Sequence, residues 1–126
     1  MEWRLFTVEE IIVLHDAVLN PGELSGMAQS ASLEGALARV EFRVQYGMIQ
    51  DAYDLAAMYA VAIARAHAFR DANKRTAHAT MKLTLKLQGI RLPLEAHEVG
   101  DIIIQTAQGQ LDEVELADWL RRARYQ

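Results

Sequence analysis

One short stretch of the sequence concentrates the residue types that could do chemistry. Positions 67 to 75 read His-Ala-Phe-Arg-Asp-Ala-Asn-Lys-Arg. As a neutral imidazole, His67 could take a proton from a hydroxyl group. Asp71 supplies the hard oxygen atoms that Mg²⁺ prefers beside bound phosphates. The stretch therefore predicts a base and a metal-binding carboxylate close together in the chain.

An anion site is expected at the same place. A new helix is predicted to begin at Asn73, and the first N–H groups of a helix lack partners within it and attract anions. Lys74 and Arg75 fall in its first turn, where cations are unfavourable unless an anion is bound. With Arg65 and Arg70, four cations lie within eleven residues. This spacing indicates a compact anion site rather than an extended surface for a polyanion.

More ordinary roles are open for the same residues. A histidine at the end of a helix is more often a cap than a base, and a lone aspartate such as Asp71 is most often a loop or cap residue. The other histidines show no metal-ligand spacing with one another and are interpreted as non-ligands: His15, His78 and His97. On spacing alone, both the catalytic and the structural interpretation of His67 stand.

The charge is distributed unevenly along the chain. The net charge is -4, which argues against a nucleic-acid binder. Residues 65–91 carry seven Lys or Arg and one acidic residue, whereas residues 92–118 carry seven acidic residues and no Lys or Arg. A simple alternative is that Lys82, Lys86 and Arg91 only solvate a helix. That alternative explains the cations around His67 less well.

Composition limits the class of protein. The chain of 126 residues has no cysteine, which excludes a thiol nucleophile and a disulfide scaffold and fits a reducing compartment. Its first residues contain no signal-peptide core, and its longest apolar run, from Leu55 to Ala64, is about half of a membrane span. We expect a cytoplasmic protein with one domain over residues 1–126 and no membrane segment.

Hydrophobic periodicity predicts six helices and therefore an all-α fold. The first follows a capping box formed by Thr7 and Glu10. The third has no charge between Asp54 and Arg65, so we expect it to be surrounded by the other helices. Gly89 is expected to stop the fourth. The expected helices cover residues 8–18, from near 32 onwards, 51–69, 74–87, 95–108 and 113–124.

A minor strand pair is the only β structure expected. Residues 90–94 alternate weakly between apolar and polar types and could pair with residues 3–6. Pro93 would limit such a strand to an edge position.

The stretch that begins at His67 resembles the core motif of the Fic/Doc superfamily, in the variant found in Doc (death-on-curing) toxins of toxin–antitoxin pairs. The resembling residues are His67, Phe69 and the run Asp71-Ala72-Asn73-Lys74-Arg75-Thr76-Ala77. Upstream segments around Leu14-His15, residues 22–26 and residues 33–39 resemble Doc proteins as well. The resemblance covers most of the chain and implies a bundle of about six helices around the central apolar one.

The resemblance implies a role for each residue of the motif. His67 would be the general base for a protein hydroxyl, and Asp71 the Mg²⁺ and phosphate-site carboxylate. The anion hole would consist of Asn73, Lys74 and Arg75 with the loop amides, which include that of Ala72. Arg65 is expected to add positive charge to the nucleotide site.

Three positions depart from the broader Fic pattern. That pattern has glycine where Ala72 and Lys74 stand, and a second arginine where His78 stands. Lys74 fills space that a glycine would leave open to a diphosphate, so the nucleotide should bind differently. In Doc toxins this departure accompanies transfer of the terminal phosphate of a nucleoside triphosphate such as ATP, in place of AMP transfer. AMP transfer, or an antitoxin-binding module with little catalysis, are the alternatives.

The resemblance also implies partners. Doc toxins phosphorylate a threonine of elongation factor Tu, which stops translation, and are neutralised by a small antitoxin of the Phd type that folds as a helix on the toxin. Such a helix needs an apolar groove. The first helix is a candidate, because Ile12, Val13 and Val18 cannot all face inward together with Ile11 and Leu14. No direct contact with nucleic acid or membrane is expected.

Overall fold

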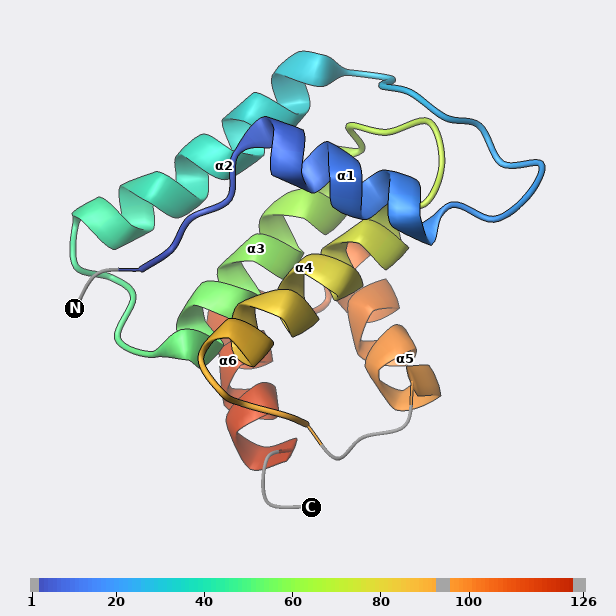
Figure 1. Ribbon diagram of the computed structural model, residues 1–126. Coiled ribbons are helices and arrows are strands. Elements are labelled where there is room, and N and C mark those ends of the chain that lie inside the picture. Colours follow the sequence, from blue (N-terminus) through green and yellow to red (C-terminus); the bar gives the residue numbers. More distant parts are fainter. Residues whose placement is uncertain (1–2, 93–95, 124–126) are drawn as a thin grey trace.

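The computed structural model describes residues 3–92 and 96–123, and these form the expected all-α fold. Six helices follow one another along the chain (Figure 1). They are α1 (Val8–Val18), α2 (Ser30–Gln45), α3 (Ala52–Ala66), α4 (Asn73–Leu87), α5 (Ala96–Ala107) and α6 (Glu113–Ala123).

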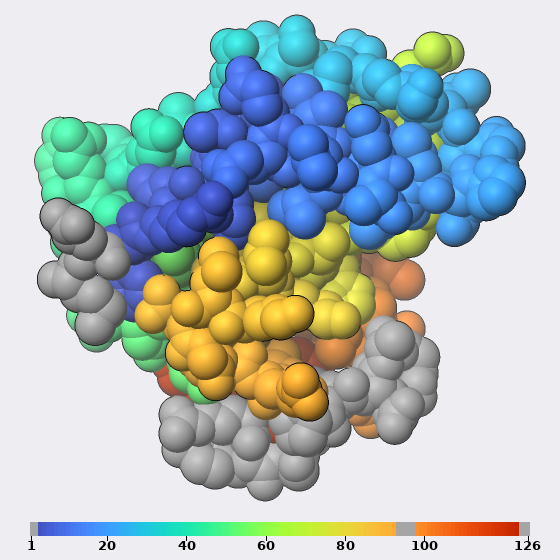
Figure 2. Space-filling view, viewed as in Figure 1, coloured from blue at the N-terminus to red at the C-terminus, as the bar shows by residue number. Residues whose placement is uncertain are grey.

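Helix α3 is the centre of the molecule. Twelve of its fifteen residues are buried, and six of these are alanines, which let neighbouring helices approach closely. Helices α2, α4, α5 and α6 all pack against it. Helix α1 packs against α4, and in Figure 2 its blue atoms lie between the cyan atoms of α2 and the yellow atoms of α4. The expectation of an apolar helix surrounded by the others is confirmed.

Helix α3 is shorter than expected because its last residues leave the helical conformation. It begins after Asp51, whose side chain accepts a hydrogen bond from the Asp54 amide over 2.9 Å. It ends at Ala66, because His67 adopts a left-handed conformation with φ 50°. The prediction that the helix continues to Phe69 was therefore wrong by three residues. The chain is thus turned away from the α3 axis at His67.

The other boundaries lie close to the expected ones. The capping box of Thr7 and Glu10 is present at the start of α1. Helix α2 begins at Ser30, two residues before the expected start, and α4 begins at Asn73, within one residue of the expected start. Helix α5 spans Ala96–Ala107 and α6 ends at Ala123, so the expected ends at Glu95 and Arg124 lie outside the described residues.

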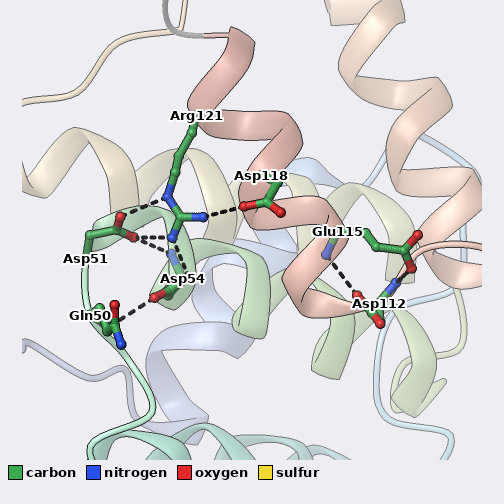
Figure 3. Close-up of polar contacts among 7 residues, drawn as sticks. All are labelled: Gln50, Asp51, Asp54, Asp112, Glu115, Asp118 and Arg121. Atoms are coloured by element: carbon green, nitrogen blue, oxygen red, sulfur yellow. Dashed lines mark hydrogen bonds and ion pairs between the residues drawn. The ribbon is translucent and has the colours of Figure 1, made fainter.

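Helix α6 is fastened to the start of α3 by one arginine. The guanidinium of Arg121 donates to Asp51 over 2.9 and 3.0 Å, to Asp54 over 2.6 Å and to Asp118 over 2.7 Å (Figure 3). Asp51 also caps α3. The contact between Arg121 and Asp51 therefore joins α6 to α3 and fixes the beginning of the central helix.

The expected strand pair is not found among the residues that the structure describes. Residues 3–6 and 90–92 have no strand conformation, whereas Pro93 and Leu94 lie outside the described ranges. A single bridge, between Met27 and Phe69, is the only β pairing within those ranges. None of the helices in the described part of the chain has the length and apolar character needed to cross a lipid bilayer.

Candidate active site

The loop between α3 and α4 has an unusual backbone at both ends. His67 and Ala72 have φ values of 50° and 66°, and they are the only non-glycine residues with positive φ among those described. This left-handed region strains residues that carry a Cβ atom. The loop therefore needs contacts that hold it, and the structure provides them from three directions.

The first set of contacts lies within the loop. Asn73 accepts a hydrogen bond from the Phe69 amide over 3.0 Å and donates one to the Phe69 carbonyl over 2.9 Å. Phe69 is buried in the core beneath the loop. The Asn73 side chain, predicted as part of an anion hole, thus serves to close the loop.

The second set comes from the long segment between α1 and α2. The amides of Ala28 and Gln29 donate to the Ala68 carbonyl over 2.8 and 3.0 Å, and the Arg70 amide donates to the Gly26 carbonyl over 3.2 Å. These backbone contacts tie the two connecting segments together along the Met27–Phe69 bridge.

The third contact comes from α1. His15 is buried, its ring is stacked on that of Phe69, and its Nε2 lies 2.8 Å from the Asp71 carbonyl oxygen. The interpretation of His15 as a non-ligand is compatible with this position.

A cavity of about 400 Å³ opens beside the loop. One wall is polar and comes from the loop, the start of α4 and the segment after α1; the other is formed by α5. The polar wall contains Glu23, Asp71, Ala72, Asn73, Lys74, Arg75 and His78, and the α5 wall contains Gly100, Ile103 and Ile104. Four predicted cofactor-binding residues and the predicted metal ligand therefore share one cavity.

Arg75 is held by protein groups within this cavity wall. Its guanidinium forms a two-point ion pair with Glu23, with Nη1 2.8 Å from Oε1, and Nη1 also donates to the Val18 carbonyl over 2.6 Å. The ion pair with Arg75, aided by the Asn20 amide, lowers the pKa of Glu23 to about 2. Arg75 thus fixes the segment after α1, and it meets a carboxylate at the place where phosphate binding was expected.

The carboxylate of Asp71 is only partly engaged. The Leu24 amide donates to Oδ2 over 2.7 Å, and no other described group donates to this side chain. No cluster of three metal-binding side chains exists within the described part of the chain. Mg²⁺ commonly takes one or two carboxylates and completes its shell with phosphate oxygens and water. Asp71 fits that mode of binding, whereas both carboxylate oxygens of Glu23 on the same wall are engaged by Arg75.

The remaining predicted residues lie apart from the cavity. Arg65 points to the connection between α5 and α6, where it donates to the carbonyls of Thr106 and Leu111 over 3.1 and 2.5 Å. The structure does not bring it to the polar wall of the cavity, because the last turn of α3 directs it to another side. His67 is exposed at the end of α3 and is not part of the cavity lining.

Sequence reasoning missed several residues of this site. Glu23 belongs to a segment that resembled Doc proteins but carried no expected role, and its contact with Arg75 joins positions 52 residues apart. The α5 wall gave no signal beyond helical periodicity. His78, half-buried on α4 where it lines the cavity, has its pKa lowered by burial and by the nearby charge of Lys82.

Comparison with known proteins adds to this geometry. The family model described as the Fic/DOC family matches residues 5–85, which contain α1 to α3, the loop and all but the last two residues of α4. The chain belongs to the Fic/Doc family. A Fic/Doc relative, protein kinase doc of Escherichia phage P1, is 39% identical over 120 residues, covering 94% of this chain and 94% of that protein.

Membership in the Fic/Doc family covers the polar wall but not the whole cavity. Glu23 and the predicted binding residues of the polar wall lie within residues 5–85. The residues of the α5 wall, Gly100, Ile103 and Ile104, come after that range. The similarity to the phage P1 relative covers 94% of this chain and therefore extends into α5 and α6.

Proposed function

We propose that this chain is a Doc-type toxin that transfers the terminal phosphate of ATP, bound with Mg²⁺, to a serine or threonine hydroxyl of a target protein. The observation that carries the proposal is the cavity in which Asp71, Lys74 and the first amides of α4 share one wall. It is supported by the match to a relative named as a protein kinase.

The chemistry required is a displacement at the terminal phosphorus. The target hydroxyl oxygen forms a bond to phosphorus, the bond to the bridging oxygen breaks, and ADP leaves. His67 takes the hydroxyl proton, and its exposed position leaves it open to a large protein substrate. The amides at the start of α4 and the Lys74 ammonium stabilise negative charge on the phosphates. Mg²⁺, when bound at Asp71, would neutralise part of the triphosphate charge.

The cavity wall imposes a condition on nucleotide binding. Arg75 must either leave Glu23 to meet a phosphate or remain bound to it and act through the position of the segment after α1. In the second case, Lys74 is the main cationic group for the phosphates, and the backbone amides at the start of α4 are neutral hydrogen-bond donors to them. We propose this second arrangement, because the guanidinium has three protein contacts to lose.

The partners follow from the same proposal. The target would be elongation factor Tu in the cytoplasm, phosphorylated on a threonine so that translation stops. A small antitoxin of the Phd type would neutralise the toxin by folding as a helix on its surface.

The test uses ATP labelled either at the terminal phosphate or on the adenosine. The purified chain is incubated with each nucleotide, with Mg²⁺, and with purified elongation factor Tu or a bacterial lysate, with His67→Ala as control. We expect label on elongation factor Tu from the terminal phosphate only. Adenosine label on a protein would show AMP transfer instead, and no label from either nucleotide would indicate an antitoxin-binding module with little catalysis.

A further inference from the structure

His15 occupies an unusual place for a histidine. Its side chain is 1% exposed within the core between α1 and the loop. The ring lies parallel to that of Phe69, with centroids 3.9 Å apart and an interplanar angle of 7°. An apolar aromatic residue would pack equally well at this position. Packing therefore does not explain why two polar ring nitrogens are buried here.

Both ring nitrogens have acceptors. Nε2 lies 2.8 Å from the carbonyl oxygen of Asp71, 56 residues away in the chain, and a carbonyl can only accept, so Nε2 carries the proton of this bond. Nδ1 lies 3.0 Å from a carboxylate oxygen of Asp16, whose side chain is 62% exposed. When Nδ1 carries a proton as well, it donates to Asp16, which then limits rotation of the ring from the solvent side, while Phe69 packs against the face of the ring.

The residue that His15 holds is the candidate metal ligand. Asp71 is fixed at its carbonyl by His15 and at its carboxylate by the Leu24 amide. It directly precedes Ala72, whose left-handed backbone leads into α4. A shift of the Asp71 carbonyl would therefore turn both its carboxylate and the first amides of α4.

We propose that His15 is a positioning residue of the active site, which holds the Asp71 backbone so that its carboxylate and the amides of α4 face the bound Mg²⁺ and phosphates. This inference rests on the proposed function. His15 lies on α1 and acts through the loop, without contact to the nucleotide.

The experiment separates the hydrogen bond from the packing. His15→Phe keeps an aromatic ring on Phe69 and removes the donor, whereas His15→Gln removes the ring and keeps an N–H donor. Tyr59→Phe is the matched control, because it deletes another buried hydrogen bond, to the Phe6 amide over 2.8 Å, away from the loop. For each variant we would measure the unfolding midpoint, kcat, KM for Mg·ATP, and the Mg²⁺ concentration that supports half-maximal activity.

We expect His15→Phe to weaken activity or the Mg²⁺ response by about 10- to 100-fold, as for other residues that orient a metal ligand. His15→Gln should recover part of that loss even if it is the less stable variant. Tyr59→Phe should lose stability and keep the kinetic constants of the folded enzyme. Activity that follows stability across all three variants would overturn the proposal.

Two further measurements keep the result decisive. If His15→Phe does not fold, Asp16→Ala releases the ring from the surface, and unchanged Mg²⁺ dependence in both Asp16→Ala and His15→Gln would overturn the proposal. Calorimetric titration with Mg·ATP needs no acceptor protein. If the wild-type chain transfers no phosphate, the proposed function fails, and the titration still shows whether His15 affects binding of Mg·ATP.

Discussion

The exposed imidazole of His67 stands at the end of the most buried helix in the molecule. Because the side chain makes no core contact, His67→Ala should leave the unfolding midpoint close to that of the wild type. Removal of a general base should lower phosphate transfer by about 100- to 10,000-fold. Transfer rates and thermal melts of the purified variant check this, and transfer at the wild-type rate would contradict the role of His67 as the base.

Lys74 is exposed and lines the cavity at the start of α4. Lys74→Gly removes its charge and opens the backbone, so it should weaken phosphate transfer and allow some AMP transfer. Lys74→Met removes the charge and leaves the space filled, so it should weaken phosphate transfer without AMP transfer. The two labelled forms of ATP distinguish these outcomes. Equal phosphate transfer by the wild type and both variants would show that Lys74 is only a solvated side chain.

The sequence predicted which residues lie together in the cavity wall, but it did not predict which groups these residues contact. Asp71, Asn73, Lys74 and Arg75 are neighbours in the chain, and a helix start brings them to one wall. The engagement of Arg75 by Glu23 depends on the path of a distant segment, and no local pattern encodes it. Arg65 lies away from this wall, and its direction depends on the phase of the last turn of α3.

Ala72 connects the loop to the first turn of α4, and its backbone is strained because it is left-handed. A left-handed conformation costs a residue with a Cβ atom about 1–2 kcal/mol. Glycine avoids this cost, but its greater freedom in the unfolded chain offsets part of the gain in stability. Ala72→Gly should therefore raise the free energy of unfolding by about 0.5–1 kcal/mol. Ala38→Gly, in the exposed interior of α2, should lower it by about 1 kcal/mol. Denaturant unfolding of both variants provides the comparison, and a loss of stability in both would refute the strain at Ala72.

Helix α1 leaves one large apolar side chain in solvent. Val13 is 67% exposed, whereas Ile12 is partly buried against the core. Val13→Glu should fold normally and weaken binding of a cognate Phd-type antitoxin by about tenfold or more, because a charge is buried at the interface. Ile12→Lys should lower stability as well.

Val114→Glu is the control for this experiment, since Val114 is 60% exposed on α6. Affinity of the antitoxin measured by calorimetry should change for Val13→Glu alone. Equal affinity of both variants and the wild type would place the antitoxin elsewhere.

Helix boundaries followed from caps and periodicity wherever these signals were local. Thr7 and Glu10 mark the start of α1, and Asp51 marks that of α3. The end of α3 could not be read in this way, because Ala68 and Phe69 are apolar and continue the helical pattern. They leave the helix to pair with residues 26–29.

For the whole molecule, stability should depend on the protonation of His78. Burial and Lys82 lower its pKa below the usual 6.5, so the unfolded chain binds the proton more tightly. The contribution of neutral His78 is fully present above about pH 6.5 and is lost as the pH falls through the lower, folded-state pKa. Wild type should therefore lose stability relative to His78→Gln between pH 7 and pH ~5. Urea unfolding of both proteins over this range checks the sign, and a constant difference would contradict it.

The fold class was predictable because the central helix is apolar on all sides and therefore needs neighbours on all sides. The expected strand pairing between residues 3–6 and 90–92 failed for a related reason. Phe6 is buried, and its amide donates to the hydroxyl of Tyr59 on α3, so the segment before α1 already has a partner. Alternation over a few residues cannot show such a competing contact.

The two walls of the cavity have different origins. The polar wall belongs to the part of the chain that matches the family as a whole, and in the proposed function it would face the phosphates, which all nucleoside triphosphates have in common. The α5 wall lies beyond that part and offers a glycine and two isoleucines, and a Cβ atom at Gly100 would meet nothing within 4 Å. Evolution can therefore reshape the second wall without disturbing the first, so that new preferences arise while the inherited chemistry is kept.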